Sequence, residues 1–442
     1  MNKKVFIKSY GCQMNVYDSE RMIELIKPMG YQRTNNLSDA NLVVLNTCHI
    51  REKASEKIYS EIGRIKKIKN NKLIKEKDFK LIIAGCVAQA EGKEMILRAP
   101  TIDAIVGPQS YHTLPEIVKN LKNNPKKIIN TNFETENKFD KLNYNKPNSS
   151  TAFVTIQEGC DKFCTFCVVP YTRGYEFSRP IEKILNEVKG YTELGVKEIT
   201  LLGQNVNSFH GLDCNNIERS LDYLIDKIAE IKSIARIRYM TSHPVDMTDN
   251  LIKCHKNNEK LMPFLHLPIQ SGSNSILKKM NRKYSIEDYY RIIDKVKSNK
   301  EDMALSSDFI VGFPGETDKD FDQTMNLIYN IKFSIAYSFI FSPRPGTPAS
   351  ALSDQIDIKV KKERLSALQS LLKKQQNDYN TQFKGKKLKI LVERKGRYSD
   401  QYVGRSIYNQ SVFMQSSNNI VGSIVNTKII GNTNFALSAE LA

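Results

Sequence analysis

Short apolar segments alternate with amphipathic helical patterns along most of this chain of 442 residues. In the first part the apolar segments are 4–7, 41–45 and 81–84, and helical patterns separate them. Strands separated by helices favour a parallel sheet that helices cover on both faces. We therefore predict a doubly wound parallel sheet in residues 1–121. The stretch 122–150, rich in Asn, Lys and Pro with little periodicity, is predicted to be a linker.

The same alternation continues in the middle of the chain. Strand candidates occur at 152–156, 197–202, 236–240, 261–267, 304–311 and 335–341. Six such units predict a partial (β/α)6 barrel within 151–378 rather than the closed barrel of eight units. An open barrel leaves a wide lateral mouth, which suits a large substrate. The remainder, 379–442, has short alternating apolar runs broken by Gly and Asn, which predicts a small all-β barrel.

The net charge points to a polyanionic partner, and its location is more informative than its total. Lys and Arg number 66 against 48 Asp and Glu, a formal net charge of +18. A lysine-rich proteome is an alternative source of that total. From Lys359 to Arg397, however, there are 13 basic residues and three acidic ones. A local patch of this kind favours a polyanion such as nucleic acid.

Composition excludes several classes of protein. No apolar stretch approaches the ~18 residues that span a bilayer, and Val5-Phe6-Ile7 is too short for the apolar core of a signal peptide. Eight cysteines in 442 residues are too few for a secreted disulfide scaffold. The sequence therefore predicts a soluble cytoplasmic protein of two to four domains without a membrane partner. Its cysteines are expected to stay reduced and available for metal.

Three cysteines form a compact motif after the first strand of the predicted barrel. Cys160, Cys164 and Cys167 have the spacing C-x3-C-x2-C. Such a loop can place three thiolates on three corners of an iron–sulfur cube. Because [4Fe–4S] clusters usually have four cysteine ligands, one iron would stay open for a small molecule. A structural zinc loop is the alternative, but it needs a fourth ligand, and the six histidines show no zinc-type pairing.

A second set of cysteines is dispersed in the sequence. Cys12, Cys48 and Cys86 each follow one of the three candidate parallel strands. The carboxyl ends of parallel strands lie along one edge of a doubly wound sheet, where ligands bind, so this topology brings the thiols together. We predict a second three-cysteine cluster with an open iron. The alternative is three unrelated buried cysteines, since Cys is often buried.

Other candidate residues have weaker signals. Cys214 lies in a polar loop and Cys254 in a helical pattern, and neither is expected to bind metal. His49, beside Cys48, is either a hydrogen-bond donor near that cysteine or a surface residue. His243 and His266 follow strand candidates of the barrel, where barrel chemistry collects, so each is a candidate for the site.

The cysteine motifs carry a family resemblance. The loop from Cys160 to Cys167, with Phe166 before its last cysteine, resembles the radical S-adenosylmethionine (SAM) superfamily. The two triads and the small β tail together resemble the methylthiotransferase family along nearly the whole chain. Matching segments are 11–15, 46–54, 157–171, 240–244, 266–273 and 312–317. Residues 402–405 resemble part of the TRAM RNA-binding domain of that family.

The resemblance implies two [4Fe–4S] clusters and SAM as cofactors. Cys160, Cys164 and Cys167 would hold the cluster that chelates SAM and cleaves it to a 5′-deoxyadenosyl radical. The auxiliary cluster on the other three cysteines would supply sulfur, with one SAM as methyl donor and another as radical source. The implied acceptor is carbon 2 of N(6)-(dimethylallyl)adenosine at position 37 of tRNA, beside the anticodon. Its C–H bond is not acidic enough for ordinary base catalysis, so cofactor chemistry is required.

Further contacts are expected from strand-end loops and from the basic tail. SAM contacts are expected from Phe166, Gly203, Gln204 and Glu316, although Gly and Pro also mark plain turns. The residues expected to meet RNA phosphates are Lys384, Lys386, Lys387, Lys389, Arg394, Lys395 and Arg397. Four aromatic residues either stack on bases or fill the core of the small barrel: Tyr398, Tyr402, Tyr408 and Phe413.

Three functions compete at this point. The first is methylthiolation of tRNA by a monomer whose partners are tRNA, a low-potential electron donor and a sulfur donor or cluster-assembly protein. The second is a sister methylthiotransferase acting on a ribosomal protein side chain or on threonylcarbamoylated adenosine. The third is an RNA-binding protein whose cysteine triads hold zinc and catalyse nothing. The basic tail and the segment 46–54 favour the first function by resemblance.

Overall fold

The computed structural model describes residues 3–48, 54–69, 79–124, 126–133, 137–139 and 150–442. The chain divides into two compact units. The first is Met1–Asn145 with Glu158–Asp161 and Cys167–Phe177, and the second is Lys146–Gln157, Lys162–Phe166 and Ser178–Ala442. Within the described ranges, no helix combines the length and the apolar character needed to cross a bilayer.

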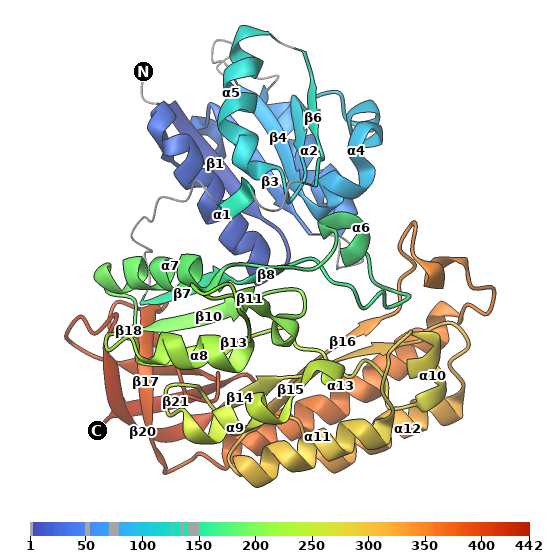
Figure 1. Ribbon diagram of the computed structural model, residues 1–442, viewed down its shortest axis with the longest axis vertical. Coiled ribbons are helices and arrows are strands. Elements are labelled where there is room, and N and C mark those ends of the chain that lie inside the picture. Colours follow the sequence, from blue (N-terminus) through green and yellow to red (C-terminus); the bar gives the residue numbers. More distant parts are fainter. Residues whose placement is uncertain (1–2, 49–53, 70–78, 125, 134–136, 140–149) are drawn as a thin grey trace. The chain divides into compact units, whose positions relative to one another are not determined.

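A six-stranded parallel sheet forms the centre of the first unit (Figure 1). Its strand order is β2-β1-β3-β4-β5-β6, and every neighbouring pair is parallel. The strands are β1 (Lys3–Ser9), β2 (Tyr31–Arg33), β3 (Leu42–Thr47), β4 (Lys80–Gly85), β5 (Ala104–Val106) and β6 (Ile128–Asn130). Its four longest helices are α1 (Gln13–Ile26), α2 (Ala54–Lys69), α4 (Cys86–Arg98) and α5 (Leu114–Asn123).

Helices cover both faces of this sheet because successive strand side chains point to opposite faces. Val44 and Ile82 pack in one core cluster with residues of α1 and α5. Val43 and Ile83, their neighbours in the chain, pack in a second cluster with residues of α2 and α4. The prediction of a doubly wound parallel sheet is therefore confirmed.

The predicted linker at 122–150 needs correction. Residues 128–130 form β6, which pairs with β5 as an edge strand of the sheet. Three residues are too few to show alternation, and Ile129 is 42% exposed, so hydropathy does not distinguish this strand from a loop. Of the remaining stretch, 125, 134–136 and 140–149 lie outside the described residues.

Six parallel strands form the centre of the second unit. They are β7 (Thr151–Thr155), β10 (Glu198–Leu202), β13 (Arg236–Tyr239), β14 (Phe264–His266), β15 (Ala304–Val311) and β16 (Ile335–Ile340). They pair as two sheets, β13-β10-β7 and β14-β15-β16, and a parallel bridge between Ile237 and Leu261 joins these sheets. No pairing joins β7 to β16 in the part of the chain that the structure describes, so the barrel is partial, as predicted.

Helices alternate with these strands along the chain (Figure 1). Most of them share one apolar core with the strands. The helices in this core are α7 (Ile181–Glu193), α8 (Leu221–Ala229), α9 (Asp249–Asn257), α11 (Ile286–Asn299), α12 (Asp318–Ile331) and α13 (Ile358–Thr381). Ile276 of α10 (Asn274–Lys279) packs in a smaller cluster that includes Phe313. A short helix, α6 (Val169–Arg173), belongs to the first unit. Leu368 and Leu372 of α13 are buried in the core.

The last five strands form a closed barrel in the order β17-β18-β19-β21-β20. They are β17 (Lys387–Lys395), β18 (Gln401–Arg405), β19 (Ser411–Gln415), β20 (Ile424–Asn432) and β21 (Ala436–Leu441). Ile390, Val412 and Leu437 are fully buried in its core. The small all-β barrel is confirmed, but the predicted boundary between 378 and 379 falls inside the last turn of α13.

Two buried arginines join this small barrel to the strands of the partial barrel. Arg238 donates from its two Nη atoms to the carbonyl oxygens of Ile407 at 2.9 Å and Ser406 at 2.7 Å. Its Nε donates to Oε1 of Glu198 at 3.0 Å. Arg236 likewise donates to two carbonyl oxygens of the small barrel, at 2.8 Å each. These bonds explain why the central and C-terminal regions form one compact unit rather than separate domains.

Candidate functional site

The three dispersed cysteines follow three adjacent parallel strands, β1, β3 and β4. Thr47, which precedes Cys48, pairs in register with Gly85, which precedes Cys86. Cys12 follows β1, and β1 pairs with the edge of β3 that faces away from β4. The strand order β2-β1-β3-β4 reverses between β1 and β3, and ligands bind at such reversal points of doubly wound sheets.

Side-chain interactions connect these three cysteines. Cys12 and Cys48 share a side-chain hydrogen bond, which outweighs burial and lowers the pKa of Cys12 to about 6. Gly11, at φ +115°, permits the approach, since a Cβ there would lie 2.7 Å from Sγ of Cys48. Burial raises the pKa of Cys86, and the charge of Cys12 acts on it in the same direction.

A buried arginine adds positive charge to this group of thiols. Arg173 forms a side-chain hydrogen bond with Cys86 and acts electrostatically on Cys12. Its guanidinium also donates to Oε2 of Glu158 at 2.8 Å and to Oδ2 of Asp18 at 3.0 Å, which holds it in place. Positive charge favours thiolates, the form that binds metal. The chemistry of this donor set therefore fits an anionic iron–sulfur cluster.

The compact motif lies in the loop after β7. Cys160 and Cys167 belong to the first unit and Cys164 to the second. Gly159 has φ +72°, and a Cβ there would overlap a backbone oxygen of the facing segment, so only glycine fits before Cys160. The backbone N–H of Val169 donates to Sγ of Cys167 at 3.5 Å. No three His, Cys, Asp or Glu side chains form a complete metal-binding group among the described residues.

Several residues at the carboxyl ends of the barrel strands have a left-handed backbone. Phe163 follows β7 with φ +48°, Thr241 follows β13 with φ +72°, and Gln270 follows β14 with φ +79°. This conformation costs energy for residues other than glycine, and such strain collects at functional sites. These strand ends are therefore the candidate site of the second unit, as expected for barrels of this kind.

Buried polar atoms without a hydrogen-bond partner lie at the same strand ends. They are Oγ1 of Thr155, Oδ1 of Asn205, Oγ of Ser242 and Nε2 of His243. Most buried polar atoms in proteins have a partner, so each of these is available to a ligand. SAM carries amino, carboxylate, hydroxyl and adenine groups that require such partners, and the strand ends therefore fit it.

His243 offers a neutral N–H at these strand ends. Its Nδ1 accepts a hydrogen bond from the backbone of Val245 at 3.3 Å, which leaves the proton on Nε2. Burial, with the charges of Arg282 and Lys162, lowers the pKa of His243 to about 2, so the ring stays uncharged. Sequence reasoning identified this residue only by its position after a strand. The unpaired Nε2 is what distinguishes it.

Three of the four predicted SAM contacts lie close to strand ends or to the compact motif. Phe166 packs against an apolar cluster that includes Phe313. Gly203 approaches Gln157 so closely that a Cβ would lie 2.5 Å from Oε1 of that side chain. The same Oε1 accepts a hydrogen bond from the backbone of Gln204 at 2.8 Å. Gly203 is therefore required for packing, and contact of these residues with SAM stays a prediction.

The fourth predicted SAM contact is engaged within the protein. Oε2 of Glu316 accepts hydrogen bonds from the backbone of Gly312 and from Nη1 of Arg364, both at 2.7 Å. Burial raises the pKa of Glu316 although both of these partners lower it. His266 is engaged as well, since its Nδ1 lies 2.9 Å from Oγ of Ser306. Neither polar group is available in the way that Nε2 of His243 is.

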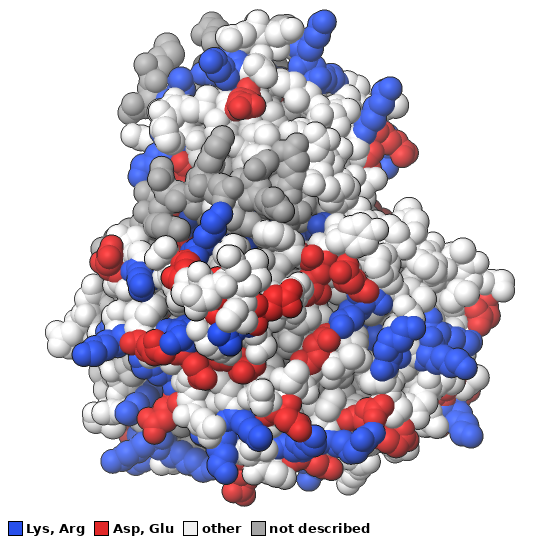
Figure 2. Space-filling model, in the orientation of Figure 1, with Lys and Arg blue, Asp and Glu red and all other residues white. Residues whose placement is uncertain are grey.

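The seven basic residues predicted to meet RNA phosphates are all exposed, on β17 or directly beside it. Figure 2 shows Lys and Arg side chains gathered over the lower edge of the small barrel. The aromatic residues divide evenly. Tyr398 is 64% and Phe413 37% exposed, whereas Tyr402 is buried and Tyr408 donates a hydrogen bond to Asp302 at 2.9 Å. Stacking on bases is therefore open only to the first two.

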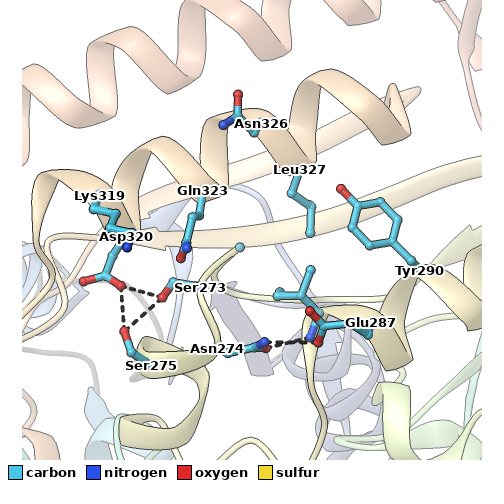
Figure 3. Close-up of a pocket in the computed structure, with 12 residues that line it drawn as sticks. Ser273, Asn274, Ser275, Glu287, Tyr290, Lys319, Asp320, Gln323, Asn326 and Leu327 are labelled. Carbon is cyan, nitrogen blue, oxygen red and sulfur yellow. Dashed lines mark hydrogen bonds between the residues drawn. The ribbon is translucent and has the colours of Figure 1, made fainter.

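A polar cavity of about 420 Å³ lies elsewhere in the second unit, between α10, α11 and α12 (Figure 3). Oδ1 of Asp320 there accepts hydrogen bonds from Ser273 at 2.5 Å and Ser275 at 2.6 Å. Asn274 and Glu287 form another hydrogen bond on the opposite side. The cavity includes none of the cluster cysteines or predicted SAM contacts. Five of its polar side chains bond one another, and we assign it no role in the chemistry.

The remaining sequence candidates lie outside both triads. Cys214 is exposed, and Cys254 is buried on α9 with its Sγ 3.7 Å from Oδ1 of Asp226. His49 lies outside the described residues. Arg173 and Arg282, which contact cluster cysteines, were missed, because a single arginine in a basic sequence carries no periodic signal.

Comparisons with known proteins agree with this arrangement. Residues 4–107 match an uncharacterized protein family, UPF0004, and residues 154–328 match the radical SAM superfamily. A radical SAM methyltransferase, TsrM from Kitasatospora setae, solved with cobalamin and a [4Fe–4S] cluster, is similar in fold, with a TM-score of 0.57 at 12% identity. That similarity covers 79% of this chain and 77% of the other.

Sequence relatives are similar over the full length. The chain is 50% identical over 444 residues to a tRNA-2-methylthio-N(6)-dimethylallyladenosine synthase of Rickettsia felis. It is also 50% identical over 446 residues to the protein of that name from Rickettsia canadensis. Both alignments cover 100% of each chain. With its two cysteine triads and its match to the radical SAM superfamily, the chain belongs to the radical SAM methylthiotransferase family, in the group of the tRNA-2-methylthio-N(6)-dimethylallyladenosine synthases.

Proposed function

We propose that this protein methylthiolates carbon 2 of N(6)-(dimethylallyl)adenosine at position 37 of tRNA, with SAM as methyl donor and radical source. The observation that carries the proposal is the full-length identity of 50% to synthases named for this reaction. The approach of Cys12, Cys48 and Cys86 at one sheet edge supports it, because a second cluster needs these thiols together. Both clusters and SAM are the cofactors that the family uses.

Each triad has a separate role in this proposal. When bound, the cluster on Cys160, Cys164 and Cys167 supplies the electron that cleaves SAM, and the auxiliary cluster supplies the sulfur. The chain's own part is to hold, orient and shield these groups. Arg173 maintains positive charge beside the auxiliary thiols. Nε2 of His243 would donate a hydrogen bond to bound SAM.

The small barrel is proposed to hold the tRNA. Its seven exposed basic residues neutralise phosphates without reading sequence, and Tyr398 and Phe413 are free to stack on bases. Arg236 and Arg238 fix this surface relative to the partial barrel. A low-potential electron donor and a source of sulfur are the other partners that the reaction requires, and the cytoplasm is where we expect it.

Mass spectrometry of tRNA nucleosides tests the proposal. Cells that lack this chain, and any redundant copy, should lose the methylthio group from dimethylallyladenosine and keep the dimethylallyl group itself. Complementation with the wild-type chain should restore the methylthio group, and Cys164→Ala should not. Persistence of the methylthio group in the deleted strain would rule the proposal out.

The alternatives make different predictions in the same experiments. If the chain is a sister enzyme, its deletion should remove the methylthio group from threonylcarbamoylated adenosine or from a ribosomal protein. The methylthio group on dimethylallyladenosine should then persist. A zinc-stabilised RNA-binding protein would contain zinc without iron or sulfide. Anaerobic purification followed by metal and sulfide analysis separates this last case from both enzymes.

A further inference from the structure

Every buried arginine in the described structure but one has a carboxylate partner. Arg179 pairs with Glu187 at 2.8 Å, and Arg364 with Glu316 at 2.7 Å. The other buried arginines with carboxylate partners are Arg21, Arg173, Arg236 and Arg238. This pattern is expected, because a buried charge without a partner is strongly destabilising.

Arg282 is the exception. It belongs to the segment that connects α10 to α11, and the residue is 8% exposed. No Asp or Glu of the described residues forms an ion pair with it, and its Nε and Nη1 donate to Tyr284 and Cys164 instead. Burial also raises the pKa of Tyr284, so the phenol stays neutral. Cys164 is a predicted cluster ligand, so a bound cluster would bring negative charge to this guanidinium.

The guanidinium is held in a fixed position against that sulfur. Nη1 donates to Sγ of Cys164 at 3.5 Å, Nη2 donates to the carbonyl oxygen of Pro268 at 2.6 Å, and Nε donates to Oη of Tyr284 at 2.9 Å. The backbone N–H of Arg282 adds a bond to Leu277 at 2.9 Å. Three side-chain bonds in different directions hold the guanidinium against Sγ of Cys164.

We propose that Arg282 is a positioning residue for the cluster on Cys160, Cys164 and Cys167, whose negative charge neutralises this buried guanidinium. The inference rests on the proposed function, because it requires that Cys164 binds an iron–sulfur cluster. The effect is reciprocal. One-electron reduction adds negative charge to the cluster, so a fixed positive charge beside a ligand sulfur stabilises the reduced form and raises the reduction potential.

The test uses the full-length protein with both clusters loaded. Iron and sulfide are counted per chain, and the potential is measured by reductive titration with dithionite, followed by electron paramagnetic resonance. The signal that SAM addition alters identifies the cluster on the compact motif. Variants are Arg282→Met, which removes the charge, and Arg282→Lys, which keeps it. Arg219→Met is the matched control, because Arg219 pairs with Asp213 on an exposed hairpin of the same unit.

Arg282→Met is expected to lower the ratio of reduced to oxidised cluster at least tenfold at a fixed potential, about 59 mV for one electron. Arg282→Lys is expected to stay close to the wild type, and Arg219→Met to equal it. If the Met variant does not fold, Arg282→Gln provides a neutral hydrogen-bonding replacement.

Two results would overturn the inference. One is a wild-type potential and a full iron content in the neutral variants. The other is an unchanged potential with weakened SAM binding, which would mean that the charge serves the SAM carboxylate. The methylthio product is measured separately. A lowered potential in the neutral variants of a protein that makes no methylthio product would retain this inference and reject the proposed reaction.

Discussion

Replacement of Arg238 by alanine tests the junction between the partial barrel and the small barrel. The side chain is 3% exposed and forms three bonds, to Glu198, Ser406 and Ile407. Alanine removes one hydrogen-bond donor from the buried carboxylate of Glu198 and the donors to the carbonyl oxygens of Ser406 and Ile407. The variant Arg238→Ala therefore loses both the connection between the barrels and the neutralisation of Glu198.

The magnitude follows from these lost contacts. Removal of one partner from a buried ion pair costs about 3–5 kcal/mol. Arg236 lies 3.7 Å from Oε2 of Glu198 and compensates part of its charge, so about 4 kcal/mol is expected. For a unit of this size, each kcal/mol lowers the melting temperature by about 2–4 °C. The melting temperature of Arg238→Ala should therefore be lower by about 10 °C.

Far-UV circular dichroism is the suitable assay, since the sequence contains no tryptophan for fluorescence. Arg238→Lys should recover part of the loss, because it keeps the charge beside Glu198. Arg219→Ala is the control, since this arginine also bonds one carboxylate but lies on the surface. A melting temperature for Arg238→Ala within about 2 °C of the wild type would show that these bonds do not stabilise the junction.

Three further outcomes are expected. Cys48→Ala should keep SAM cleavage while losing the methylthio product and about half of the iron, one cluster of two. Lys386→Glu with Lys387→Glu should weaken tRNA binding uniformly across sequences and reduce the slope of log affinity against log salt by about one per lost phosphate contact. Burial lowers the pKa of His255 to about 3, so below pH 6.5 only the unfolded chain takes up its proton. As the pH falls below 6.5, the free energy of unfolding should decrease by up to about 1.4 kcal/mol per pH unit, and His255→Gln should reduce that decrease.

Each of these outcomes has its own control. Cys214→Ala should keep the iron and the product, and loss of SAM cleavage in Cys48→Ala would contradict separate roles for the triads. Lys232→Glu with Lys253→Glu changes charge elsewhere on the second unit and should keep the salt slope. If Lys386→Glu with Lys387→Glu has the same slope of log affinity against log salt as the wild type, β17 does not contact the RNA phosphates. Identical pH dependence in wild type and His255→Gln would show that His255 is not neutral in the fold.

The strands and the cysteine positions could be predicted because both depend on local sequence. Apolar runs of four residues identified β3 and β4, and helical patterns between the strand candidates implied parallel pairing. The position of Cys12, Cys48 and Cys86 after such strands predicted their approach without any coordinates. The three-residue strand β6 was missed, because at the edge of a sheet it has too little apolar pattern to differ from a loop.

The side-chain partners at the site could not be predicted in the same way. Glu316 was expected to face SAM, yet its carboxylate is engaged by Gly312 and Arg364. Conversely, no sequence pattern singled out Oγ of Ser242, an unpaired buried atom at a strand end. Hydrogen-bond satisfaction depends on which distant segments meet, and a single sequence does not encode that in its periodicity.

The sequence by itself determined the order of strands and helices, the two sets of three thiols and the basic tail, because spacing, hydropathy and charge are local properties. Only the tertiary structure decided which charges neutralise one another. It placed Arg173 beside Cys86 and Arg282 beside Cys164, and it used Arg236 and Arg238 to join two predicted domains into one unit. Burial is the physical reason: a charge removed from water requires a partner, and the fold alone determines which residue, near or distant in the chain, supplies it.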